Sequence, residues 1–199
     1  MAIVNGYITA AELEGYLGIA DARDRVTIED TVNDASRWVD TQTGRRFYAD
    51  TTTSDRKYPV SSDRVVWTHD FYTTTGLVVK LGTSTLVLDA DYQLEPSGID
   101  MPEGFPWWGI RPLPGPWYSA FEGQTVITVT AKWGWAAVPQ PIIRATKLQA
   151  AFMFASKDAR FGVIGLDAGA PIRTKGSGAA TDLLTPYRKS STAVGLGLG

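Results

Sequence analysis

The fold is decided by residues 124–160, which read QTVITVTAKWGWAAVPQPIIRATKLQAAFMFASKDAR. Up to Trp133 the larger side chains alternate with Thr and Lys, which is the period of a half-buried β-strand. After a Trp-Gly-Trp corner, two prolines predict the first turn of a helix, because proline lacks an N–H that this turn leaves unbonded anyway. From Ile142 to Ala159 apolar residues recur every three or four positions, which predicts an amphipathic helix that ends before Gly162.

Two more helices are expected near the N-terminus. Thr9 and Glu12 have the spacing of a capping box, which predicts a short helix immediately after them. Residues 27–43 carry apolar side chains at intervals of four, three and four beginning at Ile28, and Gly44 follows as a stop signal. Together with the helix after residue 139, these segments predict a small helical bundle.

The region between residues 47 and 133 has the sequence pattern of short β-strands separated by turns. Residues 76–81 and 85–88 flank Gly82-Thr83-Ser84, which predicts a hairpin with a three-residue loop. Further strand candidates are residues 56–60, 65–67, 91–95 and 109–113. We therefore expect about five to seven short antiparallel strands that form a small barrel or sandwich.

The predicted fold class is α+β. It combines a bundle of amphipathic helices (residues 1–46 and 134–162), an inserted antiparallel β barrel or sandwich (47–133) and an extended C-terminal tail (163–199). The tail is rich in Gly, Ala, Ser and Thr, so it lacks the apolar burial that would offset about 1–2 kcal/mol of backbone ordering per residue. We therefore expect the tail to be mobile in the free subunit.

Composition excludes several classes of protein. A chain of 199 residues buries roughly 70% of its unfolded surface, which suffices for one core or two small ones. No run approaches the ~18 apolar residues of a membrane span, and the N-terminus lacks the layout of a signal peptide. Cysteine is absent, which excludes disulfides, thiol catalysis and Cys-ligated zinc and favours an intracellular protein.

Few residues have catalytic potential. His69 is the only histidine, and we expect it in a polar turn. Asp89, Asp91 and Glu95 have the spacing of one strand face, where an acid–base pair or a calcium site is conceivable, although a solvated strand face explains the same pattern. No glycine-rich segment has the context of a phosphate loop. We expect no enzymatic activity, no metal and no cofactor.

The chain has seven Trp and eight Tyr, which is many for its length. Exposed aromatic side chains on a β scaffold stack on sugars or on single-stranded nucleic acid. Alternatively they fill a small β core, because aromatic side chains bury the most area per residue, and we favour this alternative. The cluster consists of Trp107, Trp108, Trp117, Tyr118, Trp133 and Trp135.

Charge is unevenly distributed along the chain. Residues 1–143 hold 11 Lys and Arg against 18 Asp and Glu, whereas residues 144–199 hold 8 against 3. This split predicts that the basic end contacts an acidic partner or the acidic body of a neighbouring copy, although a flexible tail also needs charge for solubility. The predicted partner-docking residues are Arg160 and the apolar island with its basic end, namely Leu183, Leu184, Pro186, Tyr187, Arg188 and Lys189.

Several motifs in one order resemble a known family. In the N-terminal part they are Ile8-Thr9 with Glu12, Tyr16-Leu17-Gly18-Ile19, Ala35-Ser36-Arg37-Trp38-Val39-Asp40 and Thr43-Gly44-Arg45. Later they are Tyr92-Gln93-Leu94-Glu95-Pro96, Val129 to Trp135 with Val138-Pro139, and Phe161-Gly162-Val163. This order resembles the head–tail connector (adaptor) proteins of long-tailed bacteriophages, in particular the longer type seen in phages of actinobacteria. The long β insertion departs from the compact, all-helical members.

The resemblance implies a structural virion protein without catalytic residues. Such adaptors form rings, usually of twelve copies, between the portal protein and the stopper or tail-completion protein. Double-stranded DNA passes through the lumen as cargo. The implied location is the virion neck, assembled in the cytoplasm of the bacterial host, with no membrane contact. The alternatives are another neck or tail-completion ring protein, a tryptophan-rich module that binds carbohydrates or surfaces, and a hydrolase with an unrecognised carboxylate pair.

Overall fold

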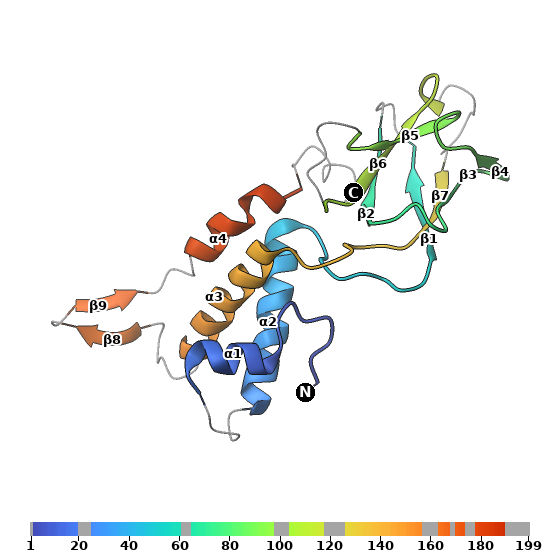
Figure 1. Cartoon of the computed structure of the whole chain (residues 1–199). Helices are drawn as coiled ribbons and strands as arrows, with labels where there is room; N and C mark the ends of the chain where they lie inside the picture. The colour runs from blue at the N-terminus through green and yellow to red at the C-terminus, as the bar shows by residue number, and fades with distance from the viewer. Residues whose placement is uncertain are drawn as a thin grey trace. The chain divides into compact units, whose positions relative to one another are not determined.

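A computed structural model of the chain describes residues 2–19, 25–60, 65–97, 104–117, 126–156, 163–167, 170–173 and 178–189. The chain forms two compact units (Figure 1). The helical unit comprises Met1–Arg45 and Val138–Gly199, and the β unit comprises Arg46–Ala137. Within the described residues, four α-helices and two antiparallel sheets of three and four strands confirm the α+β fold class.

The helices of the helical unit are α1 (Ala10–Leu17), α2 (Arg25–Thr43), α3 (Gln140–Ser156), α4 (Gly178–Leu184) and the 3₁₀ helix η5 (Thr185–Tyr187). The capping box at α1 is confirmed. The N–H of Thr9 donates to Glu12 Oε2 at 2.8 Å, and the N–H of Glu12 donates to Thr9 Oγ1 at 3.2 Å. Gly18 ends α1 in the left-handed conformation, which glycine adopts without steric cost.

Long helices α2 and α3 pack against each other, and both α1 and α4 contact them (Figure 1). The stripe predicted for α2 is confirmed, since Ile28, Val32, Ala35 and Val39 are fully buried. On α3 the buried side is Ile142, Ala145, Thr146, Gln149 and Ala150. Leu148 and Phe152 are only half buried, contrary to the predicted stripe. The pattern misleads because Thr146 and Gln149 are polar residues within the buried side.

The C-terminal segment differs from the expected extended tail. Strands β8 (Val163–Asp167) and β9 (Ala170–Arg173) pair antiparallel, and α4 packs on α3 and α2. Ala180 and Leu184 are fully buried one helical turn apart. Two hydrogen bonds then join the segment to the end of α2 and the residues just after it. The side-chain Nε of Arg45 donates to the carbonyl of Tyr187 at 2.8 Å, and the backbone N–H of Lys189 donates to the carbonyl of Thr43 at 3.0 Å. Residues 178–189 are therefore part of the helical unit.

The β unit contains two antiparallel sheets that share one core. The first has the order β1 (Ser54–Pro59), β7 (Val126–Ala131), β3 (Val78–Leu81), β4 (Ser84–Leu86), and the second has the order β2 (Val66–Phe71), β6 (Trp107–Pro112), β5 (Tyr92–Glu95). Within the described residues they do not close into a barrel. The inward residues of β7, Ile127, Val129 and Ala131, are fully buried, as the alternation predicts.

The hairpin between β3 and β4 is tighter than expected. Leu81 pairs directly with Ser84, so the loop has two residues, Gly82 and Thr83, and not three. Gly82 has a positive φ of 60°, the conformation that two-residue hairpin turns of types I′ and II′ require at their first position. This turn geometry extends the strand pairing to Ser84, a residue that the sequence pattern assigns to the loop.

The Trp133-Gly134-Trp135 corner, near the end of the β unit, forms hydrogen bonds to the segment before β1 and to strand β2. The N–H of Gly134 donates to the carbonyl of Asp70 at 2.7 Å, and the N–H of Asp50 donates to that of Trp133 at 2.8 Å. Gly134 has a φ of 96°, and a Cβ there would lie 1.8 Å from the carbonyl oxygen of Tyr48. Only glycine fits this position without moving the backbone.

Candidate functional site

The three carboxylates proposed to share a strand face do not do so. Asp89 and Asp91 lie in the turn before β5, where Asp91 Oδ2 accepts the N–H of Val87 at 2.7 Å and Asp89 has a positive φ of 67°. Glu95 is buried at the end of β5 and forms an ion pair with Arg111. Asp91 and Glu95 are thus used in a turn and an ion pair, and Asp89 is an exposed turn residue, which does not favour an acid–base or calcium site.

His69 lies in strand β2 and not in a turn. Its Nδ1 is 2.7 Å from the hydroxyl of Tyr58, whose oxygen also accepts the N–H of His69 at 3.2 Å. Burial raises the pKa of the Tyr58 phenol above its ordinary value, so the phenol stays protonated at neutral pH. The pair cross-links β1 and β2. Among the described residues no group of three or more His, Asp or Glu side chains is arranged to hold a metal.

Three tryptophans of the β unit are buried in its interior. Trp117, Trp133 and Trp135 are buried. The indole N–H of Trp133 donates to the carbonyl of Ser54 at 2.9 Å, and that of Trp135 donates to the buried Asp70 Oδ2 at 3.0 Å. These contacts favour the structural role of the aromatic cluster over a stacking platform.

The structure divides the predicted docking residues into different environments. Leu184 is fully buried in the helical unit, so its side chain does not serve as an exposed anchor. Burial also raises the pKa of the half-buried Tyr187 phenol. Pro186 and Arg188 are exposed, Leu183 and Lys189 are half buried, and Arg160 lies outside the described residues.

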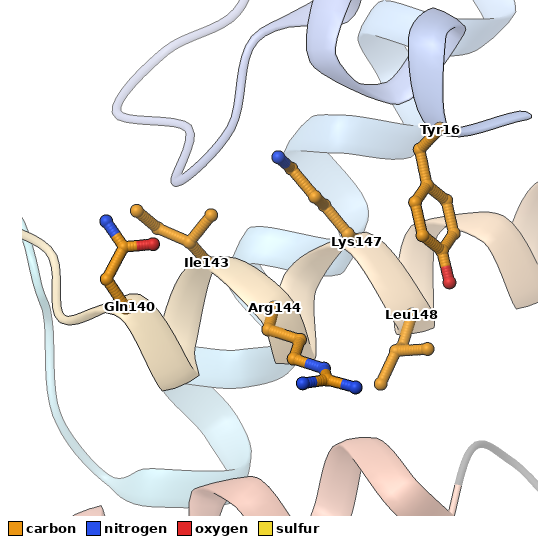
Figure 2. A pocket seen from close by; sticks show the side chains of 6 residues that line it. All are labelled: Tyr16, Gln140, Ile143, Arg144, Lys147 and Leu148. Atoms are coloured by element: carbon orange, nitrogen blue, oxygen red, sulfur yellow. The ribbon is translucent and has the colours of Figure 1, made fainter.

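The helical unit has a surface groove that sequence analysis did not identify (Figure 2). It has a cavity volume of about 340 Å³ and lies on the side of α3 that faces away from α2. We call it the α3 groove. Its lining residues are Tyr16 from α1 and Gln140, Ile143, Arg144, Lys147 and Leu148 from α3.

The α3 groove combines apolar walls with positive charge. Tyr16 is 53% exposed, and Ile143 and Leu148 are half buried. Lys147 Nζ forms an ion pair with Glu12 at 3.1 Å, at the start of α1. Arg144 is exposed and has no ion pair or hydrogen bond within the described chain. An apolar surface beside an unpaired guanidinium suits an acidic, partly apolar protein surface.

The sequence contains a weak signal for this groove. Gln140, Arg144, Lys147 and Leu148 recur at intervals of four, three and one, a stripe next to the predicted core side of the helix. Tyr16 comes from another helix, so its position beside that stripe depends on how α1 packs on α3. No helix in the described part of the chain is long and apolar enough to cross a membrane.

Comparison with known proteins gives structural similarity only. No family model matches the chain, and no curated protein matches it in sequence. A chain in the neck of an empty gene transfer agent (GTA) particle, computed with C6 symmetry, aligns with a TM-score of 0.55 at 14% identity, over 96% of this chain and 93% of its own. A chain in the virion of a native GTA particle aligns with a TM-score of 0.50 at 14% identity over the same shares. At this identity the likeness shows a shared fold.

Proposed function

We propose that this protein is a structural subunit of the neck of a phage-like particle, a head-to-tail adaptor that forms a ring between the portal and the stopper or tail. The observation that carries the proposal is the fold, which is shared over almost the whole of both chains with a protein in a GTA neck. Both units take part in this alignment, because it covers 96% of the chain. The β unit is therefore an integral part of the shared architecture and not an addition peculiar to this protein.

The chemistry of the surface supports a structural role. Among the most evident candidates for catalysis, His69, Asp91 and Glu95 are held in contacts within the β unit. The α3 groove has a basic and apolar lining, which is suited to contact with another protein. A ring requires two different complementary surfaces on each subunit, and the split of charge along the chain supplies surfaces of opposite sign.

An acidic body also suits a lumen through which double-stranded DNA passes. Residues 1–143 carry a net charge of −7, which repels phosphates instead of gripping them. On this proposal DNA is cargo, the portal and the stopper or tail-completion protein are the partners, and the ring has about twelve copies, as the family resemblance implies. The resemblance to the longer connectors of phages of actinobacteria stays a prediction.

The nearest alternative is another ring of the neck, such as a tail-completion protein. It shares the same supporting observation and differs only in the partner that the ring contacts. The tryptophan-rich binding module receives no comparable support, because Trp133 and Trp135 are buried and hydrogen-bonded.

The two ring proteins are separated by a binding experiment. The purified chain is mixed in turn with portal rings, stopper protein and tail tubes from the same particle, and complexes are measured by native mass spectrometry and electron microscopy. An adaptor binds the portal and adds a ring of density beneath it. Binding to tail tubes with no binding to portal would replace the adaptor by a tail-completion protein, and binding to neither would contradict the proposal.

A further inference from the structure

The α3 groove leaves an apolar surface and a positive charge uncovered in the single subunit. Tyr16 is 53% exposed on one wall, and the guanidinium of Arg144 has no partner in the described chain. Figure 2 shows Tyr16 on α1 and the side chains of Arg144 and Leu148 pointing the same way from α3. A surface of this kind is typical of a protein contact, in which aromatic and arginine side chains contribute much of the binding energy.

Helix α2 carries a surface of complementary chemistry. Val26 is 61% exposed, and Asp30 and Asp34 follow at intervals of four, so the three side chains lie along one side of the helix. We call this the α2 outer face. The Asp34 carboxylate is exposed and has no ion pair or hydrogen bond within the described chain. The face therefore combines the exposed side chain of Val26 with the unpaired negative charge of Asp34, whereas Asp30 is half buried and has a partner within the chain.

The two surfaces lie on opposite sides of the α2–α3 pair. Helix α2 turns Ile28, Val32 and Ala35 into the core, so residues 26, 30 and 34 point outward. Helix α3 buries Ile142, Ala145 and Gln149, so the groove residues lie on its outer side. Because α2 and α3 pack on each other, their outer sides face in opposite directions. One helical unit thus presents a basic, apolar groove on one side and an acidic, apolar ridge on the other.

We propose that the α3 groove of one copy receives the α2 outer face of the next copy, with Arg144 opposite Asp34 and Val26 against Tyr16 and Leu148. This contact rests on the proposed ring function and identifies the surface that builds the ring. A second copy is the occupant that the structure favours, because both halves of a complementary contact belong to one chain. The contact joins two different surfaces, so it propagates head to tail, which is the kind of contact that builds a ring when the rotation between copies closes, whereas a two-fold dimer would place like surfaces together.

Cysteine cross-linking tests the contact directly, because the chain has no cysteine of its own. The variant with both Asp34→Cys and Arg144→Cys is treated with a flexible bis-maleimide cross-linker, free at high concentration and bound to portal, and is analysed on a denaturing gel. A direct disulfide requires Cα atoms within about 7 Å, whereas an arginine–aspartate ion pair holds its Cα atoms farther apart, and the cross-linker spans that separation. We expect a ladder of covalent oligomers from the double variant. Either single variant alone should give no ladder, and a matched pair at Asp34→Cys and Lys80→Cys, on the β unit, should give none.

Charge reversal provides an independent test. Arg144→Glu and Asp34→Arg should each weaken self-association by about tenfold or more, and the variant that carries both should recover most of the loss because the pair is restored with exchanged signs. Lys80→Glu makes the same change of charge as Arg144→Glu at an exposed position outside the groove and should leave self-association within about twofold. Equal melting temperatures of all four variants exclude misfolding as the cause.

The outcomes separate this inference from the proposed function. Portal-bound rings without a ladder, or with no recovery in the double charge variant, would overturn the contact and leave the neck function standing. A ladder from a chain that binds no portal would support the contact and count against the adaptor. Self-association of Arg144→Glu can also be tested against another neck protein in which an acidic segment has been made basic. If that protein restores binding to Arg144→Glu and Asp34→Arg does not, the groove's occupant is that protein and the inference is wrong.

Discussion

Replacing Gly134 by alanine tests the most tightly constrained position of the β unit. The added Cβ would lie 1.8 Å from the carbonyl oxygen of Tyr48, and the φ of 96° is strained for any residue with a side chain. The neighbouring backbone must therefore move. That movement disturbs two hydrogen bonds, from Gly134 to Asp70 at 2.7 Å and from Asp50 to Trp133 at 2.8 Å.

The expected loss of stability follows from these terms. The strained conformation costs about 1–3 kcal/mol, and each disturbed hydrogen bond contributes about 0.5–1.5 kcal/mol. We expect Gly134→Ala to lower the free energy of unfolding of the β unit by about 2–6 kcal/mol, a large fraction of the ~5–15 kcal/mol that stabilises a typical domain. For a unit of this size the melting temperature falls by on the order of 10–40 °C.

Gly82→Ala is the matched control. Gly82 also has a positive φ, 60°, but no atom lies within 4 Å of the position that an added Cβ would take, so only the conformational cost of about 1–2 kcal/mol applies. Thermal unfolding followed by tryptophan fluorescence measures both variants. If Gly134→Ala and Gly82→Ala lower the free energy of unfolding by the same amount within about 0.5 kcal/mol, the Tyr48 carbonyl moves aside at little cost and the argument for a constrained corner is refuted.

Three further outcomes are expected. Leu184→Ala should lower the free energy that holds α4 on the helical unit by about 2–4 kcal/mol, clearly more than Leu183→Ala. Amide hydrogen exchange in α4 measures this difference. Fast exchange in the unmodified chain would show that the segment is loose. The N–H of Thr9 donates to the Glu12 carboxylate and holds the pKa of that carboxyl below its ordinary value of 4.5. The stability that this hydrogen bond adds to α1 is therefore present above pH 4.5 and is lost as the pH falls through the lower pKa of the folded state. Glu12→Gln should abolish this part of the pH dependence of unfolding. Asp70→Ala leaves the indole N–H of Trp135 without its acceptor and should cost about 1.5–3 kcal/mol in urea unfolding, and an unchanged midpoint would contradict the buried contact.

Local patterns predict much of the secondary structure. The capping box at Thr9 and the stripe at Ile28 identify α1 and α2, because both depend on residues within two turns of each other. Strand β7 follows from strict alternation, which one buried sheet face produces by itself. The composition of residues 163–199 predicts a mobile tail, whereas residues 178–189 pack on the helical unit. Composition averages over the segment and ignores the spacing of its few apolar residues. Ala180 and Leu184, one helical turn apart, are the fully buried apolar residues of α4.

What the sequence determined by itself is therefore the set of elements and their class: amphipathic helices around an inserted antiparallel β region, without the cysteines or histidine pairs of common active sites. Tertiary structure decided which side of α3 is buried, since Thr146 and Gln149 enter the interior while Leu148 remains at the surface. It alone placed Tyr16 of α1 in one groove with Arg144 of α3 and left the Asp34 carboxylate exposed and unpaired on α2. The physical reason is that periodicity specifies a helix and one of its sides, whereas the surface shared by two helices depends on how they pack.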